Sequence, residues 1–313
     1  EKEKMKKEES IYSMRTLSQQ EMITKHSKIK IMIILIILLF LLIFMLNQVV
    51  KNIQVQKQIK RYENQVIAYD EQQRKIAEEK NRIEEEKRKE NLVQVTEKGK
   101  ENLKTIYHSE TKRAFLTFDD GPSTVTPTIL QTLNEKGVKA TFFVLGSNAE
   151  HMPDMVKQMY EQGHYIANHG YSHVYSTIYS SPEMVLEEFN KTNGIVQNAI
   201  GDSNFNSHLF RFPGGYVGGK YADIKKQAKE LLNQNDIYNV DWNCLSGDAE
   251  TSSPTPEYIM KRIQETSNGK NSLVILMHDA QAKKVTAEKL PEIIDYLAGQ
   301  GYEFKTFYDI FEK

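Results

Sequence analysis

An uninterrupted run of Ile, Leu, Met and Phe over residues 31–46 constrains this chain's fold more than any other feature. Counted on through residue 50, the segment has about 20 residues, the length an α-helix needs to cross the hydrocarbon core of a bilayer. The alternative is the core of a cleaved signal peptide. The run is long for such a core, and no small-x-small cleavage site follows it. We therefore predict a retained single-pass transmembrane helix over residues 31–50.

The charges flanking this run favour one orientation. Three lysines precede it and two follow it: Lys25, Lys28 and Lys30, then Lys51 and Lys57. Because cytoplasmic flanks carry the excess of Lys and Arg, the N-terminus is expected inside and the rest of the chain outside the cell. Residues 1–30 are polar and are predicted to form a disordered cytoplasmic tail. The first residue is Glu rather than Met, so we expect the natural N-terminus to lie upstream.

Residues 51–104 are highly charged, contain no Pro and have a single Gly, Gly99, near their end. Apolar residues recur there with a spacing of three and four, interrupted by polar ones: Ile59, Tyr62, Val66, Tyr69, Ile76 and Ile83. This spacing predicts a helical stalk with an imperfect heptad seam. The stalk is either a solvated single-helix spacer or a parallel coiled coil that makes a homodimer.

Residues 105–313 have the pattern of one α/β domain, large enough to bury a single core. Strands are predicted over residues 113–118, 138–145, 208–212, 237–242 and 272–277. Helices are predicted over residues 126–136, 153–162, 182–198, 220–233, 256–268 and 286–299. Because strand and helix alternate, a parallel sheet or barrel is expected.

Composition excludes several classes of function. The formal net charge is −1, and no basic patch dominates, which argues against a nucleic-acid partner. The chain has one cysteine, Cys244, so neither an intramolecular disulfide nor a multi-cysteine zinc site can form.

Two adjacent carboxylates, Asp119 and Asp120, lie where the first predicted strand of this domain ends. Gly121 and Pro122 break the backbone directly after them. Neighbouring side chains on a strand point to opposite faces, but a turn can bring both together. Such a pair suits one metal ligand and one general base, although Asp and Gly also simply favour turns.

Two histidines four residues apart, His169 and His173, are the next candidates. One helical turn directs both to the same side, as in many zinc sites. With Asp120 they supply three protein ligands and leave a fourth position to water, the pattern of a catalytic rather than a structural zinc. An isolated pair of this spacing is more often on the surface, so this interpretation depends on the other motifs.

Three further motifs follow predicted strands. At Arg211 a guanidinium can pair with a carboxylate, and Gly214 lets a backbone N–H approach a substrate. Asp241 and the chain's single Trp, Trp242, end another strand, and His278 ends an apolar run. A surface Arg, a core Trp and a buried His are the structural alternatives. Because all these motifs follow strands, and α/β barrels carry active sites at that face, we predict one active site there.

In this order, the motifs resemble those of the polysaccharide deacetylases, the NodB-homology domains of carbohydrate esterase family 4. The resemblance covers about residues 110–312 and rests on Thr117-Phe118-Asp119-Asp120-Gly121-Pro122-Ser123, His169-x-x-Ser172-His173, Arg211-x-Pro213-Gly214, Asp241-Trp242 and Leu276-x-His278. It implies a distorted (β/α) barrel with fewer than eight strands. With the membrane helix and stalk, the chain most resembles the membrane-anchored peptidoglycan N-acetylglucosamine deacetylases of Gram-positive bacteria.

The resemblance also implies roles for the matching residues. Asp120, His169 and His173 would bind one divalent metal ion, usually zinc and sometimes cobalt or another ion. Asp119 would be the general base, with Arg211 as its tuning partner.

The remaining matches concern the leaving group and the pocket. His278 would be the general acid, oriented by Asp241, because an amine must be protonated before it can leave. Trp242 and Leu276 would line the pocket for the acetyl methyl group. A backbone N–H near Gly214 would help to hold the oxyanion.

The chain departs from the family pattern in two places. Many members carry an aromatic residue where this chain has Gly214, so a wall for sugar stacking is missing there. Residues 243–250, which include Asp248, differ from the usual fourth motif and leave open which acid pairs with His278. Other acetylated glycans (chitin oligomers, poly-N-acetylglucosamine or xylan) and an inactive glycan-binding barrel are the alternatives to peptidoglycan hydrolysis.

Overall fold

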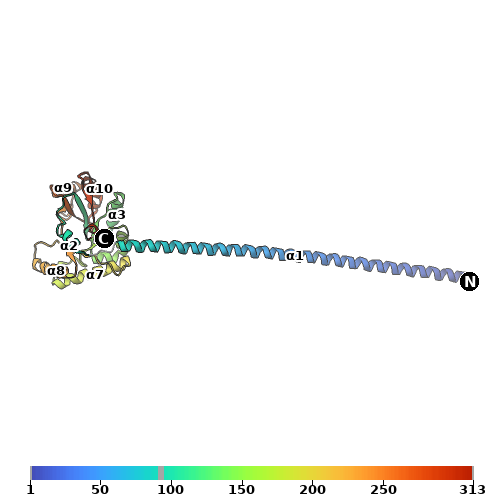
Figure 1. Ribbon diagram of the computed structural model, residues 1–313. Coiled ribbons are helices and arrows are strands. Elements are labelled where there is room, and N and C mark those ends of the chain that lie inside the picture. Colours follow the sequence, from blue (N-terminus) through green and yellow to red (C-terminus); the bar gives the residue numbers. More distant parts are fainter. Residues whose placement is uncertain (1, 91–94, 312–313) are drawn as a thin grey trace. The chain divides into compact units, whose positions relative to one another are not determined.

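The computed structural model describes residues 2–90 and 95–311. Of the predicted ranges, residue 1 of the tail, residues 91–94 of the stalk and residues 312–313 of the catalytic domain lie outside the described part. The chain divides into two units, residues 1–81 and residues 82–313 (Figure 1). Each unit is described here by itself.

The first unit lies within a single helix, α1 (Lys2–Glu90), which continues to the end of the described segment. The prediction of a disordered tail is wrong for residues 2–30, which are helical. Its sequence contains neither Gly nor Pro, so no residue in it interrupts the helical hydrogen bonds. The apolar side chains of residues 31–46 are exposed along it. Within the described residues, α1 is the one helix long and apolar enough to cross a membrane, by length and composition alone.

The second unit is built on a parallel sheet. Its strands are β1 (Arg113–Asp119), β2 (Thr141–Val144), β3 (Tyr165–Asn168), β4 (Leu209–Phe210), β5 (Tyr238–Asn239), β6 (Cys244–Leu245), β7 (Ser272–His278) and β8 (Glu303–Phe304). The continuous path runs β5-β4-β3-β2-β1-β7-β6, and the two-residue β8 pairs with β1. The structure records no pairing between the end strands β5 and β6, so the sheet is an open half-barrel, consistent with the predicted distorted (β/α) barrel.

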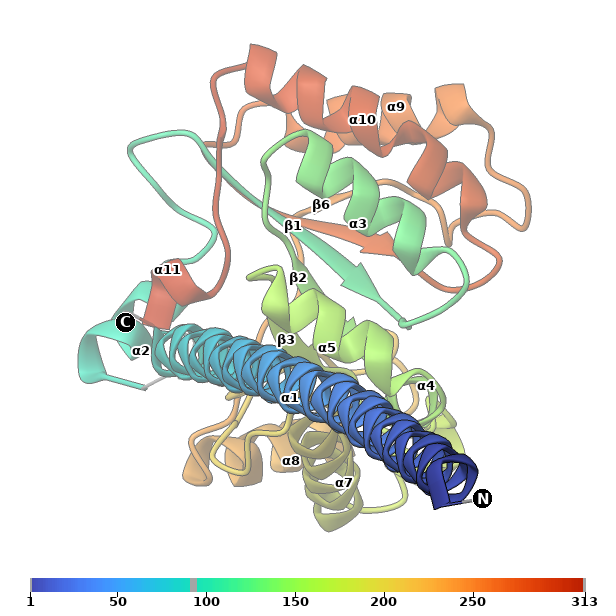
Figure 2. The same cartoon turned by 90° about the vertical axis from the view of Figure 1, so that its right-hand side faces the viewer.

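Helices connect successive strands and cover the sheet (Figure 2). They are α2 (Glu97–Lys104), α3 (Thr126–Glu135), α4 (Gly146–His151), α5 (Pro153–Glu161), α6 (Tyr175–Ile178), α7 (Pro182–Ile200), α8 (Ala222–Gln234), α9 (Pro256–Ser267), α10 (Lys284–Gly299) and α11 (Tyr308–Phe311). Proline in the first turn begins α3, α5, α7 and α9, where its missing N–H has no intrahelical partner to lose.

The core follows from the alternation of side chains along the central strands. Leu116 and Phe118 of β1 face one apolar cluster with α3, α9 and α10. Phe115, one residue away, faces a second cluster with α2 and α11 on the other side of the sheet. Because both faces of the sheet are covered, the sequences of β1 and β7 are mostly apolar rather than alternating, as is typical of buried parallel strands.

The six predicted helices and five predicted strands of this unit are all present, although β2, β4 and β5 are shorter than predicted. The strands β3, β6 and β8 were not predicted. One difference concerns the stalk, which was expected to reach residue 104. Within that range, α2 packs against α11, and its Leu103 is buried in the second apolar cluster, so α2 is part of the globular unit.

Candidate active site

The two central strands end together at the site. In the parallel register of β1 and β7, Asp119 lies directly opposite His278. The next residue, Asp120, has a left-handed backbone with φ of +71°. This turn brings the second carboxylate to the same cavity as the first, although side chains alternate along a strand.

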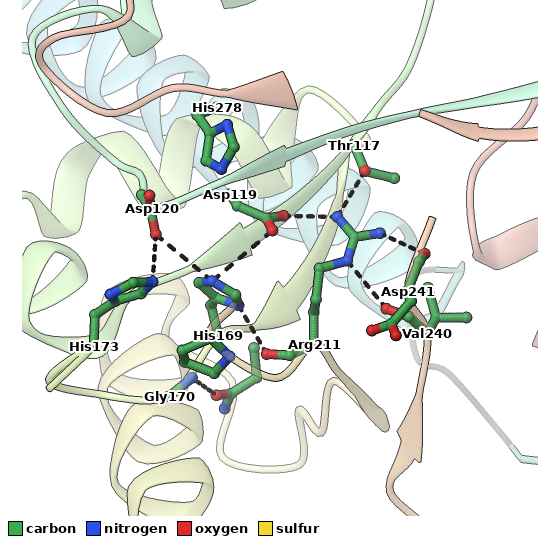
Figure 3. Close-up of polar contacts among 12 residues, drawn as sticks. Thr117, Asp119, Asp120, His169, Gly170, His173, Arg211, Val240, Asp241 and His278 are labelled. Atoms are coloured by element: carbon green, nitrogen blue, oxygen red, sulfur yellow. Dashed lines mark hydrogen bonds and ion pairs between the residues drawn. The ribbon is translucent and has the colours of Figure 1, made fainter. Parts of the chain in front are cut away.

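Asp120, His169 and His173 converge around one point (Figure 3). The Nε2 atoms of His169 and His173 lie 3.6 and 3.5 Å from Asp120 Oδ1, too far for good hydrogen bonds. One potential ligand atom from each residue lies within 4.8 Å of the others. Asp120 Oδ1 is buried and has no hydrogen-bond partner among the described atoms. An unpaired buried carboxylate oxygen between two imidazole nitrogens fits a divalent cation.

His169 is held ready to act as a ligand. Its Nδ1 lies 2.8 Å from the carbonyl oxygen of Arg211, so Nδ1 donates its proton there and Nε2 keeps a lone pair toward Asp120. Burial lowers the pKa of His169 to about 3, because the charged imidazolium is poorly solvated there. The ring is therefore neutral at neutral pH, the form that binds metals.

Asp119 has a different partner. Its Oδ1 accepts a hydrogen bond of 2.7 Å from Arg211 Nη1, and both side chains are buried. Arg211 is itself held by Thr117 Oγ1 and by the carbonyl oxygens of Val240 and Asp241 (Figure 3). Burial raises the pKa of Asp119, and the positive guanidinium opposes that rise. This pairing of Arg211 with a carboxylate is the contact that the sequence suggested.

The structure corrects the partner of His278. Its Nδ1 lies 2.8 Å from Oδ1 of Asp248, not of Asp241, and Asp248 Oδ2 also accepts from the His278 backbone N–H. Thr286 Oγ1 donates a further hydrogen bond to Asp248. Burial alone would lower the pKa of His278, but the hydrogen bond and the charge of Asp248 outweigh it and raise the pKa to about 9.

Asp241 faces away from this histidine. Its carboxylate accepts from the backbone N–H of Tyr216, at 3.2 and 3.1 Å to the two oxygens. It lines a separate cavity of about 450 Å³, whereas its neighbour Trp242 lines the cavity with Asp119 and Asp120. Adjacent side chains of extended backbone point to opposite sides unless a turn intervenes, and here Asp241 and Trp242 line different cavities.

The cavity at the strand ends has a volume of about 400 Å³ and contains most of the predicted residues. Gly214, Trp242 and Leu276 lie in its wall with Asp119, Asp120, His169, His173 and His278. Arg211 is fully buried behind Asp119. The volume is in the range of pockets that take small ligands or part of a polymer.

Three residues of the site were not predicted. Tyr175 lines the cavity beside His173. Glu188 is buried in α7 and accepts hydrogen bonds from the backbone N–H groups of Tyr171 and Ser172, within the loop between the two histidines. Asp279, next to His278, is fully buried, and burial raises its pKa to about 7.

The sequence contains a pattern that could have identified Glu188 as a buried functional residue. It lies between Val185 and Phe189 on the buried stripe of α7, where a carboxylate needs a specific partner. Tyr175 has no such pattern, because it begins the four-residue helix α6, which is too short to show an apolar stripe.

The arrangement places a three-ligand cluster beside a buried carboxylate and a protonated imidazole. A carboxylate can accept a proton from water, and an imidazolium can donate one to a leaving nitrogen or oxygen. These are the groups that hydrolysis of an amide or ester requires.

Comparison with known proteins is consistent with this chemistry. The polysaccharide deacetylase family model matches residues 107–233. A peptidoglycan-N-acetylglucosamine deacetylase of Bacillus cereus is 32% identical over 233 residues, which are 71% of this chain and 81% of that protein. The putative polysaccharide deacetylase YheN of Bacillus subtilis is 31% identical over 214 residues, 67% of this chain and 72% of that protein.

Solved structures share the fold. The catalytic domain of a peptidoglycan N-acetylglucosamine deacetylase from Eubacterium rectale superposes with a TM-score of 0.58 at 30% identity, over 64% of this chain and 90% of that one. A Streptococcus mutans carbohydrate esterase of family 4 gives a TM-score of 0.59 at 32% identity, over 66% and 90% of the two chains. From its motifs, fold and relatives, the chain belongs to the polysaccharide deacetylase family of hydrolases.

Proposed function

We propose that this protein is a metal-dependent deacetylase that removes the acetyl group from N-acetylglucosamine units of peptidoglycan. The observation that carries the proposal is the cluster of Asp120, His169 and His173 beside the facing pair Asp119 and His278 in one cavity. The proposed substrate is supported by relatives described as peptidoglycan N-acetylglucosamine deacetylases.

Asp120, His169 and His173 would hold the metal ion, with zinc the first candidate and cobalt or another divalent ion the alternatives. When bound, such an ion would polarise the amide carbonyl and lower the pKa of water toward ~7. The protein prepares this site through the Arg211 carbonyl, which orients His169. Two imidazoles and one carboxylate match the ligand set of catalytic zinc sites.

Asp119 is the proposed general base and takes a proton from the attacking water. Burial raises the pKa of this carboxyl, which makes the carboxylate a stronger base. Arg211 opposes that rise through its positive charge and its hydrogen bond to the carboxylate. Their hydrogen bond also fixes the direction of the other oxygen, Oδ2, which lies 3.8 Å from His169 Nε2.

His278 is the proposed general acid. Its Nδ1 proton is engaged by Asp248, so the proton on Nε2 is the one available to the substrate. With a pKa raised to about 9, the ring is protonated at neutral pH. An amine cannot leave as an anion, so the imidazolium donates its proton to the departing nitrogen. Asp248 takes the orienting role that the family resemblance implied for Asp241.

The cavity wall would position the acetyl group. Trp242 and Leu276 supply apolar surface for the methyl group, and the backbone at Gly214 can bring an N–H donor to the developing oxyanion. These contacts would hold the carbonyl carbon between Asp119 and His278. Orienting the substrate in this way increases the rate of hydrolysis.

The N-terminal unit would attach the enzyme to the cell membrane. Residues 31–50 are the proposed transmembrane segment, residues 1–30 a cytoplasmic tail, and residues 51 onward the extracellular part. The exposed, charged continuation of α1 would act as a stalk between the membrane and the catalytic domain, which includes α2 as well as the predicted residues 105–313. A homodimer through the stalk is the alternative, which sedimentation of the stalk would detect.

A substrate comparison tests the proposal. The full-length protein in detergent, loaded with zinc or cobalt, is incubated with purified peptidoglycan, chitin oligomers and acetylated xylan, and released acetate is measured. We expect release from peptidoglycan that is lost in Asp120→Ala. Acetate from chitin oligomers or xylan alone would contradict the proposed substrate. No acetate from any substrate at full metal loading would favour a glycan-binding barrel instead.

A further inference from the structure

Tyr175, the first residue of α6, fills the space beside Gly214. A Cβ atom at Gly214 would lie 2.5 Å from the Tyr175 hydroxyl oxygen and 3.1 Å from its Cζ. A side chain at position 214 and this phenol therefore cannot occupy the space together. Gly214 also has a φ of +74°, which favours glycine. Tyr175 is thus an aromatic side chain that packs directly against the backbone at Gly214.

The position of Tyr175 is fixed by its neighbours. Its ring centroid lies 5.5 Å from that of His173 and 5.9 Å from that of Tyr179. Tyr179 is buried and donates a hydrogen bond of 2.7 Å to the carbonyl oxygen of Pro213. Because this bond ties α6 to the loop that carries Gly214, the phenol is held in place before any ligand binds, which reduces the entropy cost of binding.

The loop at Gly214 and Gly215 lies between two aromatic side chains. A Cβ atom at Gly215 would lie 3.0 Å from the indole of Trp242. Tyr175 and Trp242 therefore flank the same stretch of backbone, and both line the cavity that contains Asp119 and Asp120.

Tyr175 is available to a ligand. Its side chain is 42% exposed, and the structure records no hydrogen bond from its hydroxyl to any other described residue. It therefore offers an apolar ring face and a free hydroxyl at the mouth of the cavity. Pyranose rings have apolar C–H faces and a rim of hydroxyls, which suits both features.

We propose that Tyr175 is a substrate-contacting residue that helps to determine which glycan is accepted. Its ring packs on the pyranose being deacetylated, and its hydroxyl hydrogen-bonds to a sugar hydroxyl. The inference deepens the proposed function and rests on it. It predicts that Tyr175 contributes to binding of the sugar and not to reaction at the acetyl group.

Two substrates separate these contributions: the N-acetylglucosamine tetramer, and 4-nitrophenyl acetate, which has an acetyl group but no sugar. For zinc-loaded full-length protein, Tyr175→Ala is expected to raise KM for the tetramer at least about tenfold. Zinc-dependent kcat/KM for 4-nitrophenyl acetate stays within about threefold of wild type. Tyr175→Phe keeps the ring but loses the hydroxyl, so its KM for the tetramer should lie between those of wild type and Tyr175→Ala. Val174→Ala is the matched control, since Val174 is the exposed neighbour outside the cavity wall.

A binding measurement without turnover completes the test. Trp242 is the chain's single Trp and lines the cavity, so its fluorescence reports binding of the tetramer to metal-free protein. Tyr175→Ala should weaken this binding at least about tenfold. Unchanged tetramer binding and KM, or equal losses on both substrates, would overturn the role of Tyr175. A wild-type protein that neither binds nor deacetylates the tetramer would overturn the inference alone, because the proposed function is tested separately by acetate release from peptidoglycan.

Discussion

Three buried carboxylates near the carboxyl ends of the strands have different partners, and burial and partner together set the direction in which each pKa shifts. Asp119 lies beside Arg211, and burial raises its pKa against the opposing guanidinium charge. Burial would also raise the pKa of Asp248, but its hydrogen bond to His278 outweighs this and lowers it. Asp279 has only a hydroxyl donor, Thr126, on one of its oxygens, and burial raises its pKa to about 7.

The pairing of His278 with Asp248 predicts a change in the pH dependence. The raised pKa of about 9 keeps His278 protonated below that pH, so turnover that needs this proton falls as pH rises through about 9. Asp248→Asn removes the charge that raises the pKa. The alkaline limb of kcat should therefore move to lower pH by at least about one unit.

Asp241→Asn is the matched control for this measurement. Its carboxylate accepts from Tyr216 and makes no recorded contact with His278. The alkaline limb of kcat should keep its position in this variant. A limb that moves in Asp241→Asn and not in Asp248→Asn would restore the partner that the sequence suggested.

Two histidine variants should separate metal binding from proton transfer. His169→Ala removes one of three ligands, so it should abolish zinc binding and activity together. His278→Ala should leave zinc binding unchanged and lower kcat by about 10²–10⁴-fold, the usual contribution of a general acid. Zinc content by metal analysis and kcat on the same preparations give the comparison. Near-wild-type kcat in His278→Ala would refute the acid assignment.

At the scale of elements, strand pairing explains which parts of the site the sequence could predict. The ends of β1 and β7 are marked by long apolar runs, so Asp119 and His278 were identified directly. Strands β5 and β6 have two residues each and carry no periodic pattern. The acid that orients His278 could therefore not be chosen from the sequence. Asp241 follows β5 and Asp248 follows β6, and neither short strand shows which strand it pairs with.

The sheet order decides between these two acids. Strand β6 pairs with β7, with Leu245 opposite Leu276, so the loop after β6 reaches His278. Strand β5 pairs with β4 at the other end of the sheet. Local sequence contains no information on which short strand joins which edge, since that pairing is made between segments far apart in the chain. The six longer helices were predicted because each has enough turns to show its apolar stripe, whereas the short helices α2, α4, α6 and α11 were not predicted.

Helix α7 supports the loop between the two histidines through Glu188, which also accepts from Ser172 Oγ at 2.6 Å. Glu188→Gln weakens these bonds and should lower zinc affinity by about 10–100-fold, as loss of an outer contact to a metal site does. Zinc affinity is measured by competition with a chelator. Glu187→Gln on the exposed face of the same helix is the control and should bind zinc as wild type does. Equal zinc affinities in the two variants would show that Glu188 does not support the metal site.

At the scale of the whole molecule, a globular catalytic unit and a long helix with an apolar segment are parts of one chain. The proposed topology puts the catalytic unit on the side of the membrane where peptidoglycan lies. Because the apolar side chains of residues 31–46 are exposed along α1, burial in a bilayer would remove them from water.

Cysteine labelling tests this topology. The native Cys244 is buried, so an introduced cysteine is the main reactive thiol. Val217→Cys, at a site 83% exposed in the catalytic unit, should react with a membrane-impermeant maleimide in intact cells. Ser18→Cys, in the tail, should react only after the cells are opened. The reverse pattern would invert the proposed orientation.

The central claim is that this chain deacetylates peptidoglycan. The most direct measurement follows acetate and free glucosamine amines released from purified peptidoglycan by the zinc-loaded full-length protein, beside Asp120→Ala. We predict that both products appear in equal amounts with the wild type and are absent with the variant. Peptidoglycan that keeps all its acetyl groups while the same preparation deacetylates another glycan would contradict the account.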